Sequence, residues 1–232
     1  KTARKNSLIV IEDATHALGA EYCGKKIGSC QYSDMTVFSF HPAKHITSGE
    51  GGAVLTNNKN YYHKLLMLRN HGITRDKKQL LNRGRPQWYY EMQDLGYNYR
   101  INDIQCALGL RQMEKMDYFL RRRRAIAHKY NLAFGKLSEA ILPICGILSN
   151  SSWHIYVIQV KSNRDKVFNA LRNLGIEANL HYIPVYLQPY YQRSGYRNVY
   201  CPNAQEYYDM AITLPLYPKM NDGEINFVIK SV

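Results

Sequence analysis

Residues 39–58, SFHPAKHITSGEGGAVLTNN, place one lysine, Lys44, between a short apolar stretch and a glycine-rich run. Residues 35–40 and 53–56 are rich in Val, Phe and Thr, which predicts two strands joined by this turn. Glycine tolerates the backbone conformations of tight turns and lets the chain approach other groups closely. Lys44 is therefore either a solvated loop cation or an amine that the turn aims at a carbonyl.

A carboxylate follows the preceding predicted strand. In VIEDATHALGA, residues 10–20, Asp13 comes directly after the apolar stretch 8–12. Open α/β sheets bind ligands at the carboxyl ends of their strands, so Asp13 and Lys44 would face one cleft if both strands belong to one sheet. The alternative is an ordinary turn or helix-capping aspartate, which is common at strand ends.

A pyridine ring between these two residues would use both of them. An amine with a lowered pKa forms a Schiff base with an aldehyde, and a carboxylate keeps a ring nitrogen protonated so that the ring accepts electrons. Ser39, five residues before Lys44, has a hydroxyl that could bind a phosphate. These three residues could together hold an aldehyde-bearing pyridine ring with a phosphate.

Composition narrows the class of protein. The chain has 232 residues, 45% of them hydrophobic, and no apolar run near the roughly 18 residues that a membrane span needs. Its first residue, Lys1, lies only a few positions before a predicted strand, and we expect an N-terminal part to be missing. Five cysteines without a Cys-x-x-Cys pair fit free thiols in a reducing compartment, which predicts a cytoplasmic protein.

The net charge of +13 raises the alternative of a basic nucleic-acid-binding domain. Its densest piece, RRRR at 121–124, lies on a predicted helix, where adjacent residues point about 100° apart and form no single stripe. The tyrosines concentrate elsewhere, which disfavours a stacking platform. A zinc site at His41 and His45 is also disfavoured, because Pro42 spoils helical geometry between them.

The remaining pattern predicts a second domain. A helix over 59–69, a long surface loop over 71–91 and one long helix over about 102–134 complete the domain 1–142. A boundary is expected between Leu142 and Ser152, and the domain 152–232 follows. Its expected elements are strands at 153–160, 176–182 and 212–218, and helices at 163–175 and 202–211.

Three motifs resemble one family. EDATHALGA, FSFHPAKHITSGEGGAVLTN and LGYNYRINDIQCALGLRQ are similar to motifs of the DegT/StrS-type nucleotide-sugar aminotransferases, in the family's order. The resemblance implies an α/β fold of the fold-type I pyridoxal-phosphate class. The chain would comprise the C-terminal part of the large, mostly parallel sheet domain and the small α/β domain.

Within the family, GIEANLHYIPVYLQPYY resembles the branch that acts in pseudaminic acid biosynthesis. This implies amino transfer from glutamate, through pyridoxal phosphate, to the C4 keto group of a UDP-linked 4-keto-6-deoxy-N-acetylhexosamine. A homodimer with shared active sites is implied as well, with no nucleic acid, membrane or metal partner.

The resemblance also assigns roles by position. Lys44 matches the Schiff-base lysine and Asp13 the partner of the pyridine nitrogen, and these two are the catalytic pair. His16 matches a residue that packs near the ring, and Ser39 matches a phosphate ligand. Asn98 matches an asparagine that is presented to the neighbouring subunit's cofactor phosphate. Arg100 and His181 match substrate-binding residues. For His181 the alternative is a hydrogen-bonded histidine at a strand end.

Two relatives of the same fold remain as alternatives. Family dehydratases have histidine in place of the lysine, so Lys44 argues against that branch. A non-catalytic or regulatory protein that keeps the fold is separated from an aminotransferase only by an assay for glutamate-dependent amination.

Overall fold

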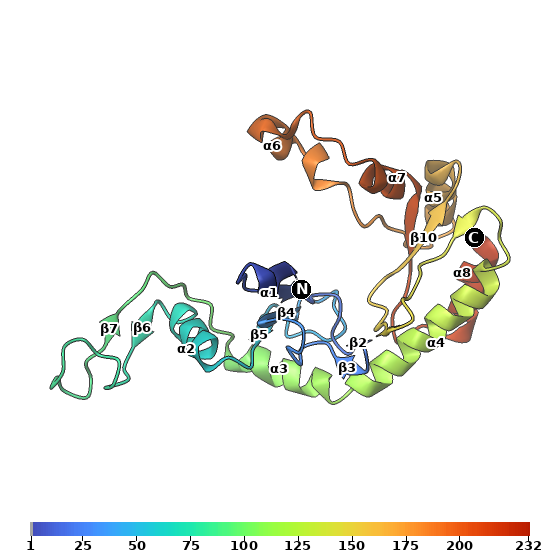
Figure 1. The fold of residues 1–232 in the computed structure, drawn as a ribbon. Helices are drawn as coiled ribbons and strands as arrows, with labels where there is room; N and C mark the ends of the chain where they lie inside the picture. Colours follow the sequence, from blue (N-terminus) through green and yellow to red (C-terminus); the bar gives the residue numbers. More distant parts are fainter. Residues whose placement is uncertain (1) are drawn as a thin grey trace. The chain divides into compact units, whose positions relative to one another are not determined.

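The computed structural model describes residues 2–232, which form two compact units, 1–115 and 116–232 (Figure 1). The division comes earlier than the boundary expected between Leu142 and Ser152. The reason is that α4 (Met116–Phe134) packs with the second unit, where it contacts α8 (Asp222–Ser231).

The first unit is built on a three-stranded sheet in the order β1-β4-β5. β1 (Ile11–Asp13) runs parallel to β4 (Met35–Ser39), with Asp13 opposite Val37. β4 is antiparallel to β5 (Gly52–Leu55), with Ser39 opposite Gly52. The strands expected at 35–40 and 53–56 are therefore confirmed, and the strand expected at 8–12 begins later, at Ile11.

Short elements surround this sheet. They are α1 (Thr2–Lys5), the hairpin strands β2 (Glu21–Tyr22) and β3 (Lys25–Lys26), α2 (Lys59–Leu68), and α3 (Asp103–Met113). The segment expected as a loop at 71–91 carries an antiparallel pair, β6 (Ile73–Thr74) and β7 (Glu91–Met92), so it is a long hairpin and not an unpaired loop.

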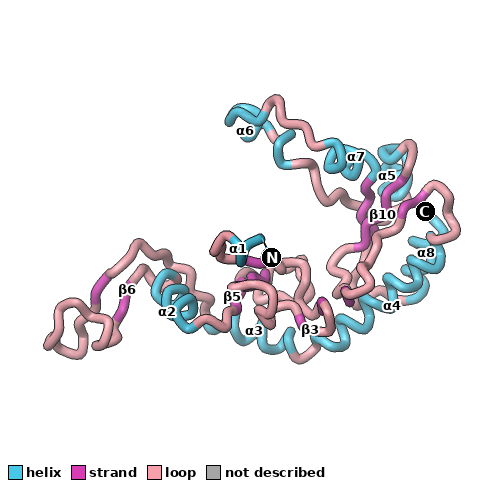
Figure 2. Tube along the Cα trace, viewed as in Figure 1, coloured by secondary structure: helices cyan, strands magenta, loops and turns pink. Residues whose placement is uncertain are grey.

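The second unit contains an antiparallel sheet in the order β11-β10-β8. β10 (Tyr156–Val160) lies between β8 (Ala140–Ile141) and β11 (Ala211–Leu214). Its other elements are β9 (Ser149–Asn150), α5 (Arg164–Asn173), α7 (Pro202–Met210), α8, and the short helical turns η1 (Val185–Leu187), α6 (Pro189–Tyr191) and η2 (Gln192–Tyr196). In Figure 2 the segment that carries these turns is mostly loop.

A hydrophobic core fills the second unit. α4 contributes Ile126, Tyr130 and Phe134, and the strands contribute Tyr156 and Ile158, all at most 1% exposed. These side chains come from one amphipathic helix and from β10, the sheet's central strand, which is how a helix-on-sheet layer buries its apolar faces.

Two expected elements are wrong. The single helix expected over 102–134 is two helices, because α3 ends at Met113 and α4 begins at Met116. At the break the Lys115 amide donates to the Gln112 carbonyl, three residues back, in place of the fourth (3.0 Å). No Gly or Pro lies at the break, and the apolar spacing continues through it. The sequence therefore predicted one helix.

The strand expected at 176–182 is also wrong. This segment forms only one isolated bridge, Asn179 to Thr213 on β11, with backbone hydrogen bonds of 3.0 and 2.7 Å. Conversely, α8 was not expected, although Asn221 and Glu224 form a capping box at its start.

Candidate active site

The carboxyl ends of two parallel strands bring Asp13 and Ser39 to one edge of the first unit's sheet. Asp13 is the last residue of β1 and Ser39 the last of β4, and the two strands are direct neighbours. The backbone continues from β1 in register, because the Ala14 amide donates to the Val37 carbonyl at 2.9 Å. This is the edge at which open α/β sheets place their ligands.

Lys44 lies in the turn that leaves β4 at this edge. The Lys44 amide donates to the His41 carbonyl at 2.9 Å, which closes a tight turn. Two further hydrogen bonds stabilise the turn after Lys44: the Ser48 amide and the Thr47 hydroxyl both donate to the Phe40 carbonyl, at 3.1 and 3.0 Å. The lysine's backbone is thus held by local hydrogen bonds, and its side chain is half-buried.

The glycines after Lys44 serve the pairing of β4 with β5. A Cβ atom at Gly52 would lie 2.6 Å from the Phe38 carbonyl oxygen, and one at Gly51, where φ is +147°, would lie 2.6 Å from the Ser48 hydroxyl. Only residues without a side chain fit there. Gly52 therefore lets β5 approach β4 closely, and Gly51 lets the connecting turn close against Ser48.

The charges of Asp13 and Lys44 interact. The pKa of Lys44 is lowered because partial burial disfavours the ammonium, and the Asp13 carboxylate opposes that shift. The pKa of Asp13 is lowered chiefly by the backbone amide and then the hydroxyl of Thr15, with smaller contributions from His16 and Lys44. The pair therefore combines an amine that loses its proton more readily than an ordinary lysine with a carboxylate that stays ionised.

Thr15 is a site residue that the sequence reasoning missed. Its amide donates to Asp13 Oδ1 at 3.1 Å, so Asp13 accepts a bond from the residue two positions on, as in an Asx turn. The signal was present in the sequence as Asp-x-Thr after a strand. This turn orients the carboxylate and keeps it ionised.

His16 and Ser39 both lie at the same edge and are half-buried. His16 is close enough to Asp13 to lower its pKa, and its expected place near the pyridine ring stays a prediction. The Ser39 hydroxyl accepts the His41 amide at 3.3 Å, and its own proton remains available to an oxygen acceptor. An amine, an ionised carboxylate and a hydroxyl are the donor set that pyridoxal phosphate requires, so these residues fit the group.

Asn98 and Arg100 lie on an exposed strip beside the end of α2. Asn98 forms an isolated bridge with Asn70, and the neighbouring Tyr97 and Tyr99 rings stack at 4.9 Å. Arg100 Nη1 donates to Asn70 Oδ1 at 2.6 Å. Asn98 is exposed, which suits a residue presented to another molecule.

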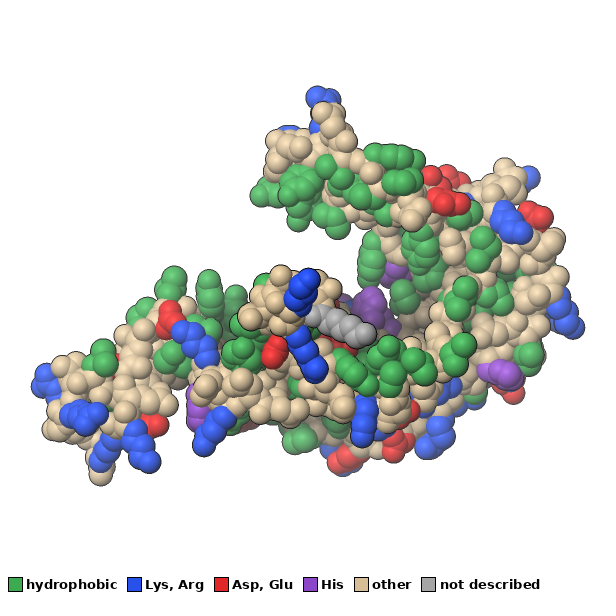
Figure 3. Space-filling view, in the orientation of Figure 1, with side chains coloured by type: hydrophobic (Ala, Val, Ile, Leu, Met, Phe, Trp, Pro, Cys, Tyr) green, Lys and Arg blue, Asp and Glu red, His purple; other side chains and the backbone are tan. Residues whose placement is uncertain are grey.

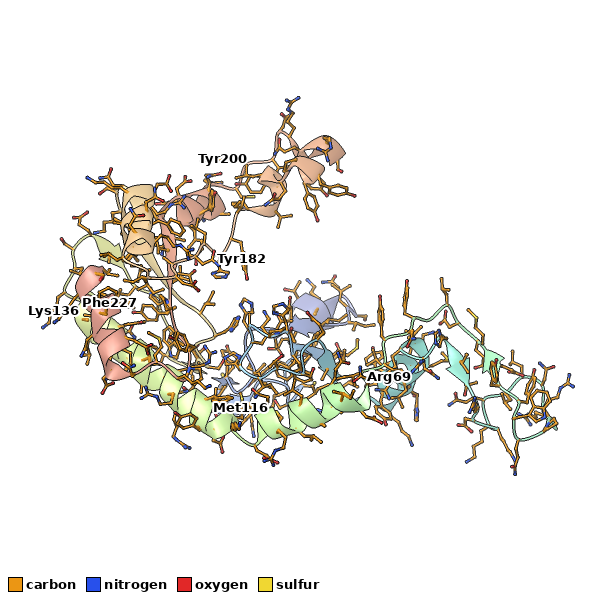
Figure 4. The ribbon with its side chains drawn as sticks, turned by 180° about the vertical axis from the view of Figure 1, so that it is seen from behind. Arg69, Met116, Lys136, Tyr182, Tyr200 and Phe227 are labelled. Carbon is orange, nitrogen blue, oxygen red and sulfur yellow. The ribbon has the colours of Figure 1, made fainter. Side chains whose placement is uncertain are left out.

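His181 belongs to the second unit. Its Nδ1 lies 2.8 Å from the Thr213 hydroxyl on β11, and its ring meets that of Tyr182 edge-on. Figure 4 shows Tyr182 and Tyr200 on the loop-rich segment between β10 and α7. The hydrogen bond is the one that the structural alternative for His181 predicts, and its substrate-binding role stays a prediction.

The arginine quartet holds the second unit together. Arg123 is 5% exposed and its Nη1 donates to the carbonyls of Trp153, His154 and Leu216 at 3.0 to 3.2 Å. Arg122 donates to the Pro218 carbonyl at 3.3 Å and Arg124 to that of Ser151 at 3.1 Å. Three of the four side chains therefore bind backbone carbonyls of the second unit.

A large apolar cavity, of about 1080 Å³, lies elsewhere in the first unit. It is bounded by β4, β5, α2 and α3, and its apolar lining includes Phe38, Val54, Leu66, Ile101 and Leu110. Asp13 and Lys44 do not line it. Within residues 2–232 no cluster of three His, Cys, Asp or Glu side chains could hold a metal ion, and none of the helices is long and apolar enough to cross a membrane.

Comparison with known proteins shows which family the chain resembles. The sequence profile of the DegT/DnrJ/EryC1/StrS aminotransferase family matches residues 1–232. The chain is 37% identical to a Campylobacter jejuni protein named UDP-4-amino-4,6-dideoxy-N-acetyl-beta-L-altrosamine transaminase, over 97% of this chain and 58% of that protein. The chain spans about 60% of the length of the curated relatives it matches.

Solved structures agree with this. Helicobacter pylori PseC, described as an aminotransferase of pseudoaminic acid biosynthesis, superposes with a TM-score of 0.88 at 30% identity, over 99% of this chain and 60% of that one. The PLP form of the putative sugar aminotransferase Spr1654 from Streptococcus pneumoniae superposes with a TM-score of 0.85 at 30% identity, over 100% of this chain and 58% of that one. The α/β, fold-type I class expected from the motifs is confirmed, and the chain belongs to the DegT/DnrJ/EryC1/StrS aminotransferase family.

Proposed function

We propose that this chain is the lysine-bearing part of a pyridoxal-phosphate-dependent nucleotide-sugar aminotransferase. The observation that carries the proposal is the interaction of Asp13 and Lys44 at the carboxyl edge of the β1-β4-β5 sheet. Membership of an aminotransferase family, and a lysine where the family's dehydratases have histidine, support amino transfer over dehydration.

The substrates follow from the relatives. A UDP-linked 4-keto-6-deoxy-N-acetylhexosamine is proposed as acceptor, because the C. jejuni relative is named for a UDP-linked 4-amino sugar and PseC is described as an aminotransferase of pseudoaminic acid biosynthesis. Glutamate is proposed as donor on the motif resemblance. A homodimer with Asn98 facing the neighbouring subunit's cofactor phosphate, and His181 with Arg100 near the sugar nucleotide, are proposed on the motif matches. The cytoplasmic location expected from composition also stays a proposal.

Each residue has a distinct task. Pyridoxal phosphate, when bound, supplies an aldehyde that bonds to amines and a ring that accepts electrons. With the cofactor bound, Lys44 Nζ would be the nucleophile toward its aldehyde, and as a free amine it would carry a proton to and from the substrate carbon. Its lowered pKa raises the fraction of neutral amine available for both tasks.

Asp13 acts without moving. Its lowered pKa keeps it ionised, so its charge would keep a proton on the ring nitrogen of a bound cofactor. The Ser39 hydroxyl would donate to the cofactor phosphate, and His16 would pack near the ring.

The experiment is Lys44→Ala in the complete enzyme. We expect loss of glutamate-dependent amination and of the visible absorbance of the bound cofactor, because no other amine replaces the nucleophile. Lys64→Ala is the matched control, since Lys64 is an exposed lysine on α2 that pairs with Asp94. Retention of both signals in the Lys44 variant would remove the central assignment.

A further inference from the structure

A second concave site lies at the base of the β6–β7 hairpin. It is a cavity of about 440 Å³ lined by Asn70, His71, Ile73, Arg75, Tyr90 and Arg100. The lining contains two guanidinium groups and no carboxylate. Concave sites of several hundred Å³ with a few convergent polar groups are where small ligands bind.

Both arginines are held by uncharged partners. Arg100 donates to Asn70 Oδ1 at 2.6 Å, and the Arg75 guanidinium lies 5.6 Å from the centre of the Tyr90 ring. In the described part of the chain neither makes an ion pair with a carboxylate. Since a guanidinium has five N–H donors, most of the donors on each remain available to an anion.

The rest of the hairpin adds positive charge. Residues 75–90 contain five Lys or Arg side chains and one acidic residue, Asp76. Figure 3 shows the blue side chains gathered over this end of the first unit. The Arg85 guanidinium also lies over an aromatic ring, that of Tyr89, at 5.4 Å. Such a field attracts anions toward the cavity.

A buried carboxylate gives the hairpin its shape. Glu91 is 9% exposed and accepts the amides of Leu81 and Asn82, both at 2.7 Å, and the side-chain amides of Asn82 and Gln93, at 3.0 and 3.1 Å. The four donors therefore engage the Glu91 carboxylate within the hairpin itself. Glu91 is the first residue of β7 and directly follows Tyr90, whose ring contacts the Arg75 guanidinium.

We propose that the cavity between Arg75 and Arg100 binds a phosphate or diphosphate group. Two guanidiniums match the oxygens of a phosphoryl group by paired N–H donation, and the volume exceeds what a single carboxylate fills. The inference deepens the proposed function, on which it rests for the identity of the natural ligand, because a nucleotide-linked sugar carries a diphosphate. Glu91 is a positioning residue for this site.

Isothermal titration calorimetry on the apo chain tests the site, with inorganic phosphate, pyrophosphate, UDP and uridine as probes. Saturable binding of pyrophosphate and UDP, and none of uridine, is expected. Arg75→Gln should weaken pyrophosphate at least tenfold, whereas Arg121→Gln, which removes the same charge from an exposed residue of α4, should leave it within twofold. Equal losses in the two variants, or no saturable binding, would overturn the proposal.

Comparing UDP with inorganic phosphate, and adding a single-stranded oligonucleotide as a competitor, distinguishes the possible ligands. UDP binding more tightly than inorganic phosphate assigns a diphosphate, and equal binding assigns a single phosphoryl group. A single-stranded oligonucleotide that outcompetes pyrophosphate and also depends on Arg75 would overturn a small-ligand site in favour of nucleic acid.

Glu91→Gln distinguishes a shaped site from general charge attraction. The substitution removes a negative charge beside a basic hairpin, so charge alone would tighten pyrophosphate binding. The proposal expects binding to weaken at least fivefold, with circular dichroism showing the variant folded. Tighter binding would contradict it. Pyrophosphate binding is measured without turnover, so a failure of the proposed amino transfer leaves this test intact.

Discussion

Lys44 and Asp13 show how one charge pair is tuned by two opposite effects. Partial burial favours the neutral amine, and the carboxylate favours the ammonium. Burial is the larger effect, so the amine's pKa falls while its counter-ion stays in place. Thr15 matters here because its amide and hydroxyl keep Asp13 ionised without depending on the lysine.

Arg123 carries a prediction at the same scale. Arg123→Ala should lower the free energy of unfolding by about 3 kcal/mol, because it removes a charged donor from one buried and two part-buried carbonyls and leaves a cavity. Urea denaturation followed by circular dichroism measures this. The exposed neighbour Arg121→Ala should change the value by no more than about 0.5 kcal/mol. Similar losses at both positions would show that the buried hydrogen bonds contribute nothing specific.

At the scale of elements, two hairpins carry the residues of the two proposed sites. The β4–β5 hairpin depends on Gly52, which admits a close approach of backbone to backbone, and on Gly51, which adopts a positive φ beside Ser48; Lys44 lies in the connection between the strands. The β6–β7 hairpin is organised by the Glu91 carboxylate instead. One turn is shaped by the absence of side chains and the other by a single buried charge.

The second hairpin should respond to acid. Its backbone donors and the Asn82 and Gln93 side chains lower the pKa of Glu91 from 4.5 to about 2. A lowered pKa means that the hairpin's stabilisation is complete above about pH 4.5 and is lost as the pH falls toward 2. Carbon NMR of the Glu91 carboxyl should show a midpoint near 2, and the amides of Leu81 and Asn82 should lose exchange protection over the same range. A midpoint near 4.5 would contradict this.

At the scale of the whole molecule, the buried apolar residues are distributed unevenly. Of the twenty-five buried hydrophobic residues found among residues 2–232, four lie in the first unit: Ala14, Phe38, Ile46 and Leu80. The other twenty-one lie in the second unit, where most belong to one cluster. α3 buries no side chain, whereas α4 buries seven.

This difference predicts unequal autonomy. Residues 116–232 expressed alone should unfold cooperatively in calorimetry, because the fragment contains a complete core. Residues 1–115 alone should unfold without a cooperative transition and should bind a hydrophobic dye at the open apolar cavity. A sharp transition for the first fragment, or none for the second, would show that the visible core does not set stability.

The amino-acid sequence by itself determined the strand–turn–strand around Lys44, the carboxylate at the end of the preceding strand, and the family. Strand alternation, turn glycines and motifs can be recognised from residues that are close in sequence, without knowing which distant residues they contact. Only the tertiary structure decided that the helix breaks near Glu114, that Arg123 is buried, and that Glu91 organises a hairpin. The physical reason is sequence separation: Arg123 is satisfied by carbonyls 30, 31 and 93 residues away, and no local period of 2 or 3.6 residues encodes such partners.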